Sequence, residues 1–298
     1  MESKGKFALI DAGGNNNCSR ITSYLNTKEV KELEFIIASH MHYDHVSCLT
    51  TVMSSFSTKK VIMKKYNGYD NGNNWGYYNN ILNTAGSKVE YFSGTSSKSV
   101  ILGNFNINLF NGEERLSNVK GQYSENSNSI VAVTSITKGN RKMLTYIASD
   151  IQDSNVSIES NIANIVTQVY ENKVFDIYVA SHHGYRSCNK TAAIGSGSGK
   201  LQFKNAIVTN TLEWMCGTYC GKANGCPYDN QSVPGIYNIY QNLLRNGGSS
   251  QIRFSGANTV VVDYTLNGVN ITGGQALNCT TSLCNTPENI YKLIQIHQ

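Results

Sequence analysis

Hydrophobic and polar residues alternate along this chain in two rhythms, which predict strands and helices in turn. Short apolar runs bounded by turn residues, typical of buried strands, occupy residues 7–11, 33–38, 61–63, 89–92, 105–110, 130–134, 143–148, 174–180, 206–209, 251–254 and 259–266. Apolar residues at helical spacing predict helices at residues 19–25, 46–56, 75–82, 156–170 and 235–245, and another near 290–296. We expect strands 251–254 and 259–266 to form a hairpin. Because strands and helices alternate throughout, the sequence predicts a layered α/β fold.

The composition is that of a globular protein and excludes several other classes. Of 298 residues, 40% are hydrophobic and only 15% are charged, and asparagine supplies much of the remaining polarity. Apolar residues are spread along the whole chain, which argues against disorder. No run of about 18 apolar residues occurs, so the sequence predicts no membrane span. The first residues show no signal peptide and begin at a glycine turn, as if trimmed, which leaves both a cytoplasmic and a secreted protein open.

Charge says little about the partner, and the cysteine pattern leaves the disulfide state open. The net charge of +5 permits an anionic substrate, but no Lys/Arg run is longer than two. A nucleic-acid partner is therefore possible without being supported by the charge. The eight cysteines include no CxxC pair. Cys216, Cys220 and Cys226 cluster in one segment and Cys279 and Cys284 in another, and either group could be bridged or remain as thiols.

Five of the six histidines lie in two clusters, and each cluster directly follows a predicted strand. The first cluster reads His40-x-His42-x-Asp44-His45. A strand that leaves a sheet alternates its side chains, so His40 and His42 can chelate one ion, while Asp44 and His45 can reach a second. Imidazole and carboxylate together suit Zn²⁺, or a neighbouring ion such as Mn²⁺. The alternative is a surface loop whose histidines are satisfied by ordinary hydrogen bonds.

Two more strand ends carry side chains of the same kind. Asp150 follows strand 143–148, where a carboxylate can bridge two ions. Its alternative role is to cap the next helix, which Asp153 could do equally well. His182-His183-Gly184 follows strand 174–180. We favour His182 as a ligand of the second ion and His183 as a contact to substrate, although spacing alone does not separate them.

These motifs resemble the metallo-β-lactamase superfamily. The HxHxDH motif, the turn Asp11-Ala12-Gly13-Gly14, the strand-end Asp150 and the His182-His183 pair occur in the superfamily's order. The resemblance implies an αββα sandwich with a dinuclear metal site on its rim. It covers a hydrolase domain of residues 1–272, on which we expect a cysteine-containing tail, residues 273–298, to pack. Members of the superfamily cleave lactams, thioesters, lactones and phosphodiesters, so the resemblance alone does not fix the substrate.

Two branches of that superfamily resemble this chain in further segments. They are the metallo-hydrolase domain of bacterial competence proteins and the phosphorylcholine esterases that trim teichoic acid. The likeness rests on Asn126-Ser127-Asn128-Ser129-Ile130 and on Val61-Ile62-Met63-Lys64-Lys65-Tyr66. Because both branches act on phosphodiesters, that substrate class is favoured.

The chain also departs from the family pattern in two places. Many members carry another metal-binding histidine near residue 126, where this chain has Glu125, Asn126 and Asn128. That leaves a more open first site, completed by water or by Glu125 or Asn126. Where the competence proteins have a Gly-His-Pro motif, this chain has Gly225-Cys226-Pro227. Cys226 is therefore expected either to border the active site or to form a disulfide with Cys216 or Cys220.

The sequence therefore suggests a dinuclear metal-dependent hydrolase, and a phosphodiesterase in particular. One ion is expected on His40, His42 and Asp150, and the other on Asp44, His45, Asp150 and His182, with a bridging hydroxide as nucleophile. Asp44 would orient the hydroxide, while Asn128 and His183 would contact the phosphoryl group of a small or polymeric substrate. The alternatives are a same-fold hydrolase of a lactone, thioester or lactam, a nuclease proper, and a non-catalytic metal-binding module. The oligomeric state stays open.

Aromatic residues add a minor hypothesis. Trp75, Tyr77, Tyr78 and Trp214 could hold a quaternary ammonium group or stack on a base. Their alternative is plain packing. His297 is expected to be structural or solvated.

Overall fold

The chain divides into two units, which we describe separately. The computed structural model describes residues 1–66, 73–114, 125–153, 157–185, 188–210, 233–248, 251–256, 258–278, 286 and 289. The first unit contains the described residues up to 132, and the second contains those from 133 onward. Among the described helices, none has the length and apolar character needed to cross a membrane.

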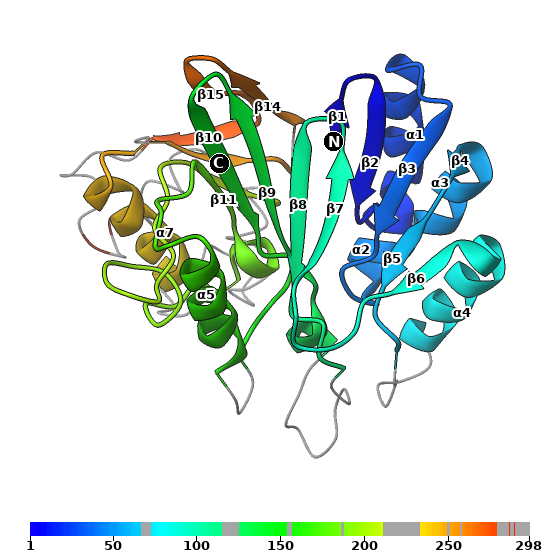
Figure 1. Ribbon diagram of the computed structural model, residues 1–298, viewed down its shortest axis with the longest axis horizontal. Helices are drawn as coiled ribbons and strands as arrows, with labels where there is room; N and C mark the ends of the chain where they lie inside the picture. Colours follow the sequence, from blue (N-terminus) through cyan, green and yellow to red (C-terminus); the bar gives the residue numbers. More distant parts are fainter. Residues whose placement is uncertain are drawn as a thin grey trace, which may run out of the picture. The chain divides into compact units, whose positions relative to one another are not determined.

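A mainly parallel sheet built from strand–helix repeats forms the frame of the first unit (Figure 1). Its strands, in spatial order, are β1 (Glu2–Ser3), β2 (Lys6–Ile10), β3 (Glu32–Ile37), β5 (Val61–Met63) and β6 (Val89–Tyr91), with β4 (Ser57–Thr58) paired to β3. Only β1 runs antiparallel to its neighbour. Strands β7 (Lys98–Leu102) and β8 (Phe105–Phe110) form an antiparallel hairpin. The short β7 was not predicted from the sequence.

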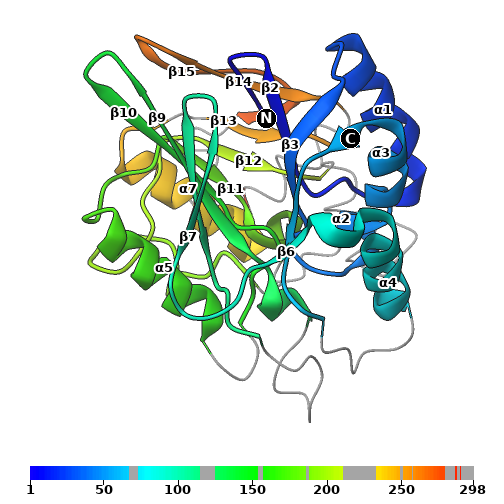
Figure 2. The same ribbon diagram turned by 45° about the vertical axis from the view of Figure 1, so that its right-hand side comes forward.

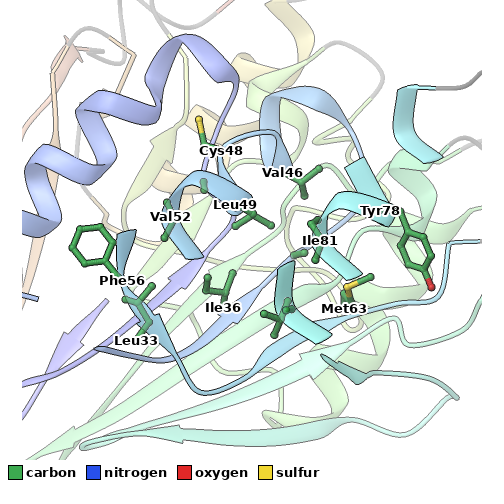
Figure 3. Close-up of a cluster of buried hydrophobic side chains, with 14 of the residues drawn as sticks. Leu33, Ile36, Val46, Cys48, Leu49, Val52, Phe56, Met63, Tyr78 and Ile81 are labelled. Carbon is green, nitrogen blue, oxygen red and sulfur yellow. The ribbon is translucent and has the colours of Figure 1, made fainter. Parts of the chain in front are cut away.

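Helices cover one face of this sheet and bury its core. They are α1 (Cys18–Thr27), α2 (Tyr43–Val46), α3 (Leu49–Ser55) and α4 (Asn73–Ala85), with short turns η1 (Asn15–Asn17), η2 (Gly86–Lys88) and η4 (Glu125–Asn128). Figures 1 and 2 show α1, α3 and α4 on the same side of the strands. Leu33 and Ile36 of β3 meet Leu49 and Val52 of α3 and Ile81 of α4, all without exposed area (Figure 3). Each such buried side chain contributes about 1.5–3 kcal/mol.

A disulfide fastens two of these helices together. Cys18 at the start of α1 is bonded to Cys48, which immediately precedes α3, with a Cα–Cα distance of 5.2 Å. Nothing in the spacing of the cysteines indicated this pair. The two cysteine groups singled out from the sequence, at 216–226 and 279–284, lie outside the described residues. The third described cysteine, Cys188, is buried.

The second unit contains a second sheet with its own helices. Its strands follow the order β9 (Val131–Lys138), β10 (Arg141–Ile147), β11 (Ile177–Val179), β12 (Ala206–Val208), β13 (Gln251–Phe254) and β16 (Gln275–Asn278). Strands β10 to β13 are parallel to one another, and β16 is antiparallel to β13. Helices α5 (Ile158–Val169) and α7 (Val233–Arg245) lie alongside these strands (Figures 1 and 2). A further short turn, η5 (Ser181–Gly184), follows β11.

Aromatic rings fill the centre of the second unit. Tyr178 stacks on Phe203 with ring centroids 4.5 Å apart, and Tyr146 stacks on Tyr178 at 5.8 Å. All three rings are almost fully buried. β10 carries Tyr146 and β11 carries Tyr178, and both strands end at the turns that hold Asp150 and the second histidine cluster. The packing of the rings therefore fixes the ends of β10 and β11.

The mixed α/β class predicted from the sequence is confirmed, with two local corrections. The predicted hairpin between 251–254 and 259–266 is wrong, because β14 (Val260–Thr265) pairs with β15 (Gly268–Gly273) instead. Gly268 closes that turn with φ 126°, a conformation that favours glycine. The helix predicted over 46–56 is divided into α2 and α3. Strand β16 lies in the first part of the predicted tail, residues 273–298. The helix predicted near 290–296 lies outside the described residues. The predicted domain limits stay a prediction.

Candidate metal centre

Asp11 organises the first histidine cluster. It follows β2, and Ser39 follows the neighbouring parallel strand β3, so both lie at the same edge of the sheet. The Asp11 carboxylate accepts hydrogen bonds from the Ser39 backbone N–H at 2.8 Å and from its hydroxyl at 2.7 Å. It also accepts a bond from Nδ1 of His45 at 2.7 Å. The Asp11 carboxylate therefore connects Ser39, just before the HxHxDH motif, to His45 at its end.

These bonds fix which nitrogen of each imidazole can bind a cation. A carboxylate only accepts, so Nδ1 of His45 carries the proton and Nε2 carries the lone pair. The Ser39 hydroxyl, which donates to Asp11, lies 3.0 Å from Nδ1 of His40 and can accept a hydrogen bond from that N–H. His40 therefore also presents Nε2. The backbone of His45 is held as well, since its carbonyl accepts bonds from Ala12 and Gly13 at 2.8 and 3.1 Å.

Three imidazoles gather in the first unit. The ring centroid of His40 is 4.8 Å from that of His42 and 4.2 Å from that of His45. Nε2 of His40 lies 3.1 Å from Nδ1 of His42. Two nitrogens bound to one tetrahedral zinc at ordinary bond lengths are about 3.3 Å apart. The pair therefore fits a shared ion. Asp44 projects from α2 with its carboxylate 4.0 Å from Nε2 of His45.

Glu125, which the sequence offers as a further ligand of the first ion, contacts the HxH segment in the structure. Glu125 is buried, and its Oε1 accepts the Met41 backbone N–H at 2.9 Å, between His40 and His42. Its Oε2 accepts a bond from the Asn128 amide at 3.4 Å. Glu125 thus supports the HxH segment through its backbone. Asn126 and Asn128 are buried in the same turn, η4.

The second histidine cluster is built on an unusual turn of the second unit. Strands β10 and β11 are parallel neighbours, and Asp150 and His182 follow their ends. His182 and His183 both adopt left-handed backbone conformations, with φ of 46° and 52°, and Ser149 has φ of 51°. Such conformations cost on the order of 1–3 kcal/mol each in residues other than glycine. Strain of this kind concentrates at functional sites.

Asp150 lies between both histidines of this turn. Its Oδ2 is 3.6 Å from Nε2 of His182 and 3.6 Å from Nε2 of His183. Nδ1 of His182 lies 3.1 Å from Gln152 Oε1, and Nδ1 of His183 lies 2.9 Å from the Thr209 hydroxyl and 3.2 Å from its carbonyl. The two distances to Asp150 are equal, but the groups of possible metal ligands that contain Asp150 include His183 and not His182. The preference for His182 stays a prediction. The alternative cap role belongs to Asp153, which accepts the Glu159 N–H at 2.9 Å.

Asn189 stabilises the turn η5 through hydrogen bonds of its side chain. It is fully buried, and its Oδ1 accepts bonds from the Tyr178 hydroxyl at 2.7 Å and the Ser181 N–H at 3.1 Å. Its amide donates to the Ser181 carbonyl at 3.1 Å. The Asn189 backbone N–H is in turn bound by buried Glu159 at 2.8 Å. The supporting roles of Asn189 and Glu159 were not predicted from the sequence, because their contacts join positions from three separate elements.

The donor sets fit divalent metal ions. Both units contribute histidine and aspartate side chains to the groups that could hold a metal ion. His40, His45, His182 and His183 all have Nδ1 beside an oxygen acceptor, an arrangement common among metal-ligating histidines. The predicted ligand sets draw on both units, and their combination stays a prediction.

The aromatic residues of α4 pack against each other and against neighbouring rings. The rings of Tyr66, Trp75 and Tyr78 have centroids 5.6–6.1 Å apart. The Tyr78 hydroxyl bonds that of Tyr91 at 3.0 Å. Trp75 is nevertheless 49% exposed, so a role of these rings in ligand binding stays a prediction. Trp214, Cys226 and His297 lie outside the described residues.

Comparison with known families supports the predicted resemblance over part of the chain. A family model described as the metallo-beta-lactamase superfamily matches residues 1–83. That segment contains β2, β3 and the HxHxDH motif, whereas Asp150 and His182 lie beyond it. Superfamily members are metal-dependent hydrolases. Closeness to competence proteins or phosphorylcholine esterases stays a prediction. A search of curated proteins found no match to this sequence.

Solved structures give a weaker likeness of the same kind. The chain is similar to the metallo-beta-lactamase SMB-1 bound to 2-mercaptoethanesulfonate, with a TM-score of 0.39 and 15% identity over 61% of this chain and 71% of that one. It is similar to BJP-1 of Bradyrhizobium japonicum, with 0.39 and 10% over 60% and 68%. It is also similar to GOB-18 of Elizabethkingia meningoseptica, with 0.40 and 17% over 61% and 68%. Likeness at this level carries no information about the substrate.

Proposed function

We propose that this protein is a metal-dependent phosphodiesterase. The observation that carries the proposal is that four imidazoles each have Nδ1 beside an oxygen acceptor and Nε2 within 4.0 Å of another candidate ligand of the same unit. As the sequence predicted, His40, His42 and Asp150 would hold one ion, and Asp44, His45, Asp150 and His182 the other. Zn²⁺ is the first expectation and Mn²⁺ the second.

Residues of the chain would orient the metal ligands, accept a proton and contact the substrate. A divalent cation, when bound, lowers the pKa of a water molecule and offsets negative charge on phosphoryl oxygens. Asp11 keeps His45 in the tautomer that offers Nε2, and does the same for His40 through Ser39. Asp44, which is half exposed, can accept a proton from the attacking water. Asn128 and His183 are proposed contacts of the phosphoryl group.

Two features favour a phosphodiester over a carbonyl substrate. The net charge of +5 suits an anion. In addition, Glu125 supports the Met41 backbone where many relatives have a further metal-binding histidine. Fewer protein ligands leave more room for a bulky tetrahedral phosphoryl group. The segments shared with phosphodiesterase branches of the superfamily point the same way.

Hydrolysis of bis(p-nitrophenyl) phosphate by the metal-loaded protein tests the proposal. Asp44→Ala is expected to lower kcat/KM a hundredfold or more, which corresponds to about 3 kcal/mol of transition-state stabilisation. Asp263→Ala, an exposed position on β14, removes the same group far along the sequence and is expected to leave turnover unchanged. Hydrolysis of nitrocefin or a lactone without any phosphodiester turnover would transfer the assignment to a carbonyl substrate. Metal binding without turnover of either class would favour a binding module.

A further inference from the structure

Glu159 of α5 places a carboxyl group inside the second unit. Its exposed fraction is 3%. Oε1 accepts the Asn189 backbone N–H at 2.8 Å, and the Lys190 backbone N–H also donates to the carboxyl group. Oε2 is buried as well, and it has no hydrogen-bond partner among the residues that the structure describes. The carboxyl group is therefore bound to segment 188–190 without being fully satisfied.

The surroundings of Glu159 favour its neutral, protonated form. Burial raises the pKa of Glu159 to about 8, and the N–H of Asn189 opposes this only in part. Other titratable or charged groups also interact with the carboxyl group, and among the described residues these are Asp153, Lys190, Tyr146 and Tyr178. The charge of Asp153 disfavours ionisation of Glu159, and that of Lys190 favours it. The proton of Glu159 is thus held until mildly alkaline pH.

Asn189 connects this carboxyl group to the second histidine cluster. The side chain of Asn189 bonds both the N–H and the carbonyl of Ser181, each at 3.1 Å. Ser181 directly precedes His182 and His183, whose left-handed backbone conformations persist only where the surrounding structure enforces them. A short path of buried hydrogen bonds therefore leads from Glu159 to the two histidines.

We propose that Glu159 is a positioning residue whose protonation state controls the turn η5 through Asn189. As a neutral acid it keeps segment 188–190 in place. A buried carboxylate is costly, and water lowers that cost when the segment bound to it moves away. The bonds of Asn189 to Ser181 are then lost, and the histidines are no longer held. The inference concerns the site of the proposed function without resting on the reaction, since its test needs neither metal nor substrate.

Hydrogen exchange of backbone amides in the whole chain, with EDTA present, tests this coupling. Protection factors, which are corrected for the intrinsic pH dependence of exchange, are measured from about pH 5 to pH 9. The amides of Ser181, His182 and Asn189 are expected to lose protection by up to about tenfold per pH unit, because each opening releases one proton, and to level off above about pH 8. They should also exchange faster than the slowest amides of β12 and β13, which report unfolding of the whole unit.

Three variants separate the proton of Glu159 from its shape. Glu159→Gln keeps an acceptor oxygen without a titrating proton, so the turn should stay protected and the pH dependence should disappear. Glu159→Leu removes the acceptor and should lower the protection of the turn at every pH. Glu171→Gln removes an exposed carboxylate of the same unit and should reproduce the pH dependence of the unaltered chain.

Several results would overturn the proposal. They are a turn whose protection does not change with pH, the same pH dependence in Glu159→Gln as in the unaltered chain, and full protection of the turn in Glu159→Leu. Equal protection of the turn and of the slowest amides at every pH would overturn it too, because the turn would then open only with the whole unit. That last comparison needs the unaltered chain alone and does not depend on the folding of any variant.

Discussion

Removing the disulfide between Cys18 and Cys48 is expected to destabilise the first unit strongly. The two cysteines are 30 residues apart, so the bond closes a loop that includes β3 and the whole HxHxDH motif. For a loop of about 30 residues, the chain-entropy model gives about 12 cal/mol/K, or about 3.6 kcal/mol at 25 °C. That is a large share of the 5–15 kcal/mol by which folded domains are typically stable, as an order of magnitude.

Urea unfolding of the double variant Cys18→Ser/Cys48→Ser measures this effect. With an m-value of about 2–3 kcal/mol/M, the midpoint should fall by about 1.2–1.8 M relative to the oxidised wild type. Reductant should lower the wild-type midpoint toward that of the double variant, which controls for the other cysteines. Thiol titration of the denatured, unreduced protein should find at most six of the eight cysteines reactive, since two are bonded. An unchanged midpoint, or eight reactive thiols, would refute the reasoning.

Two other predictions concern the partly buried carboxylate of Asp11 and the buried carboxylate of Glu159. Asp11→Asn removes the charge that holds Nδ1 of His45, and it is expected to weaken metal affinity about 10- to 100-fold, measured by competition with a chromophoric chelator; an unchanged affinity would contradict this role. Burial raises the pKa of Glu159 from 4.5 to about 8. Between those values the folded chain keeps a proton that the unfolded chain releases, so stability falls as the pH rises, by an amount on the order of 4 kcal/mol. Glu159→Gln should flatten this dependence in urea unfolding at pH 5 and pH 8, and parallel curves for the two proteins would exclude it.

The strands that precede the histidine clusters could be predicted because their signals are local. Apolar runs at 33–38 and 174–180 correspond to β3 and β11, and the histidines follow them directly. In α/β folds, side chains at the carboxyl ends of strands form sites, so the positions of these clusters along the chain were themselves informative. The same rule identified Asp150, which follows β10.

The supporting contacts could not be predicted because they depend on pairing between distant segments. Asp11 meets Ser39 and His45 only because β2 and β3 are adjacent and in register. Lys64 donates to Asn128, 64 positions away, and a single sequence carries no signal for such a pair. The error at 251–266 has a similar origin, since β13 takes a parallel partner, β12, far away in the sequence. Alternation shows that a strand exists without showing its neighbour.

The acceptors that fix the imidazoles have a consequence for the maturation of the protein. In small zinc domains the ion organises its ligands, and the apoprotein is unfolded. Here Asp11 holds His45, Gln152 and Thr209 hold the second pair, and each unit has its own buried apolar residues. If the chain binds metal as proposed, we therefore expect it to fold before it acquires the ion. Exchange of one ion for another would then require no refolding, and the supply of ions at the time of loading would decide which one the protein carries.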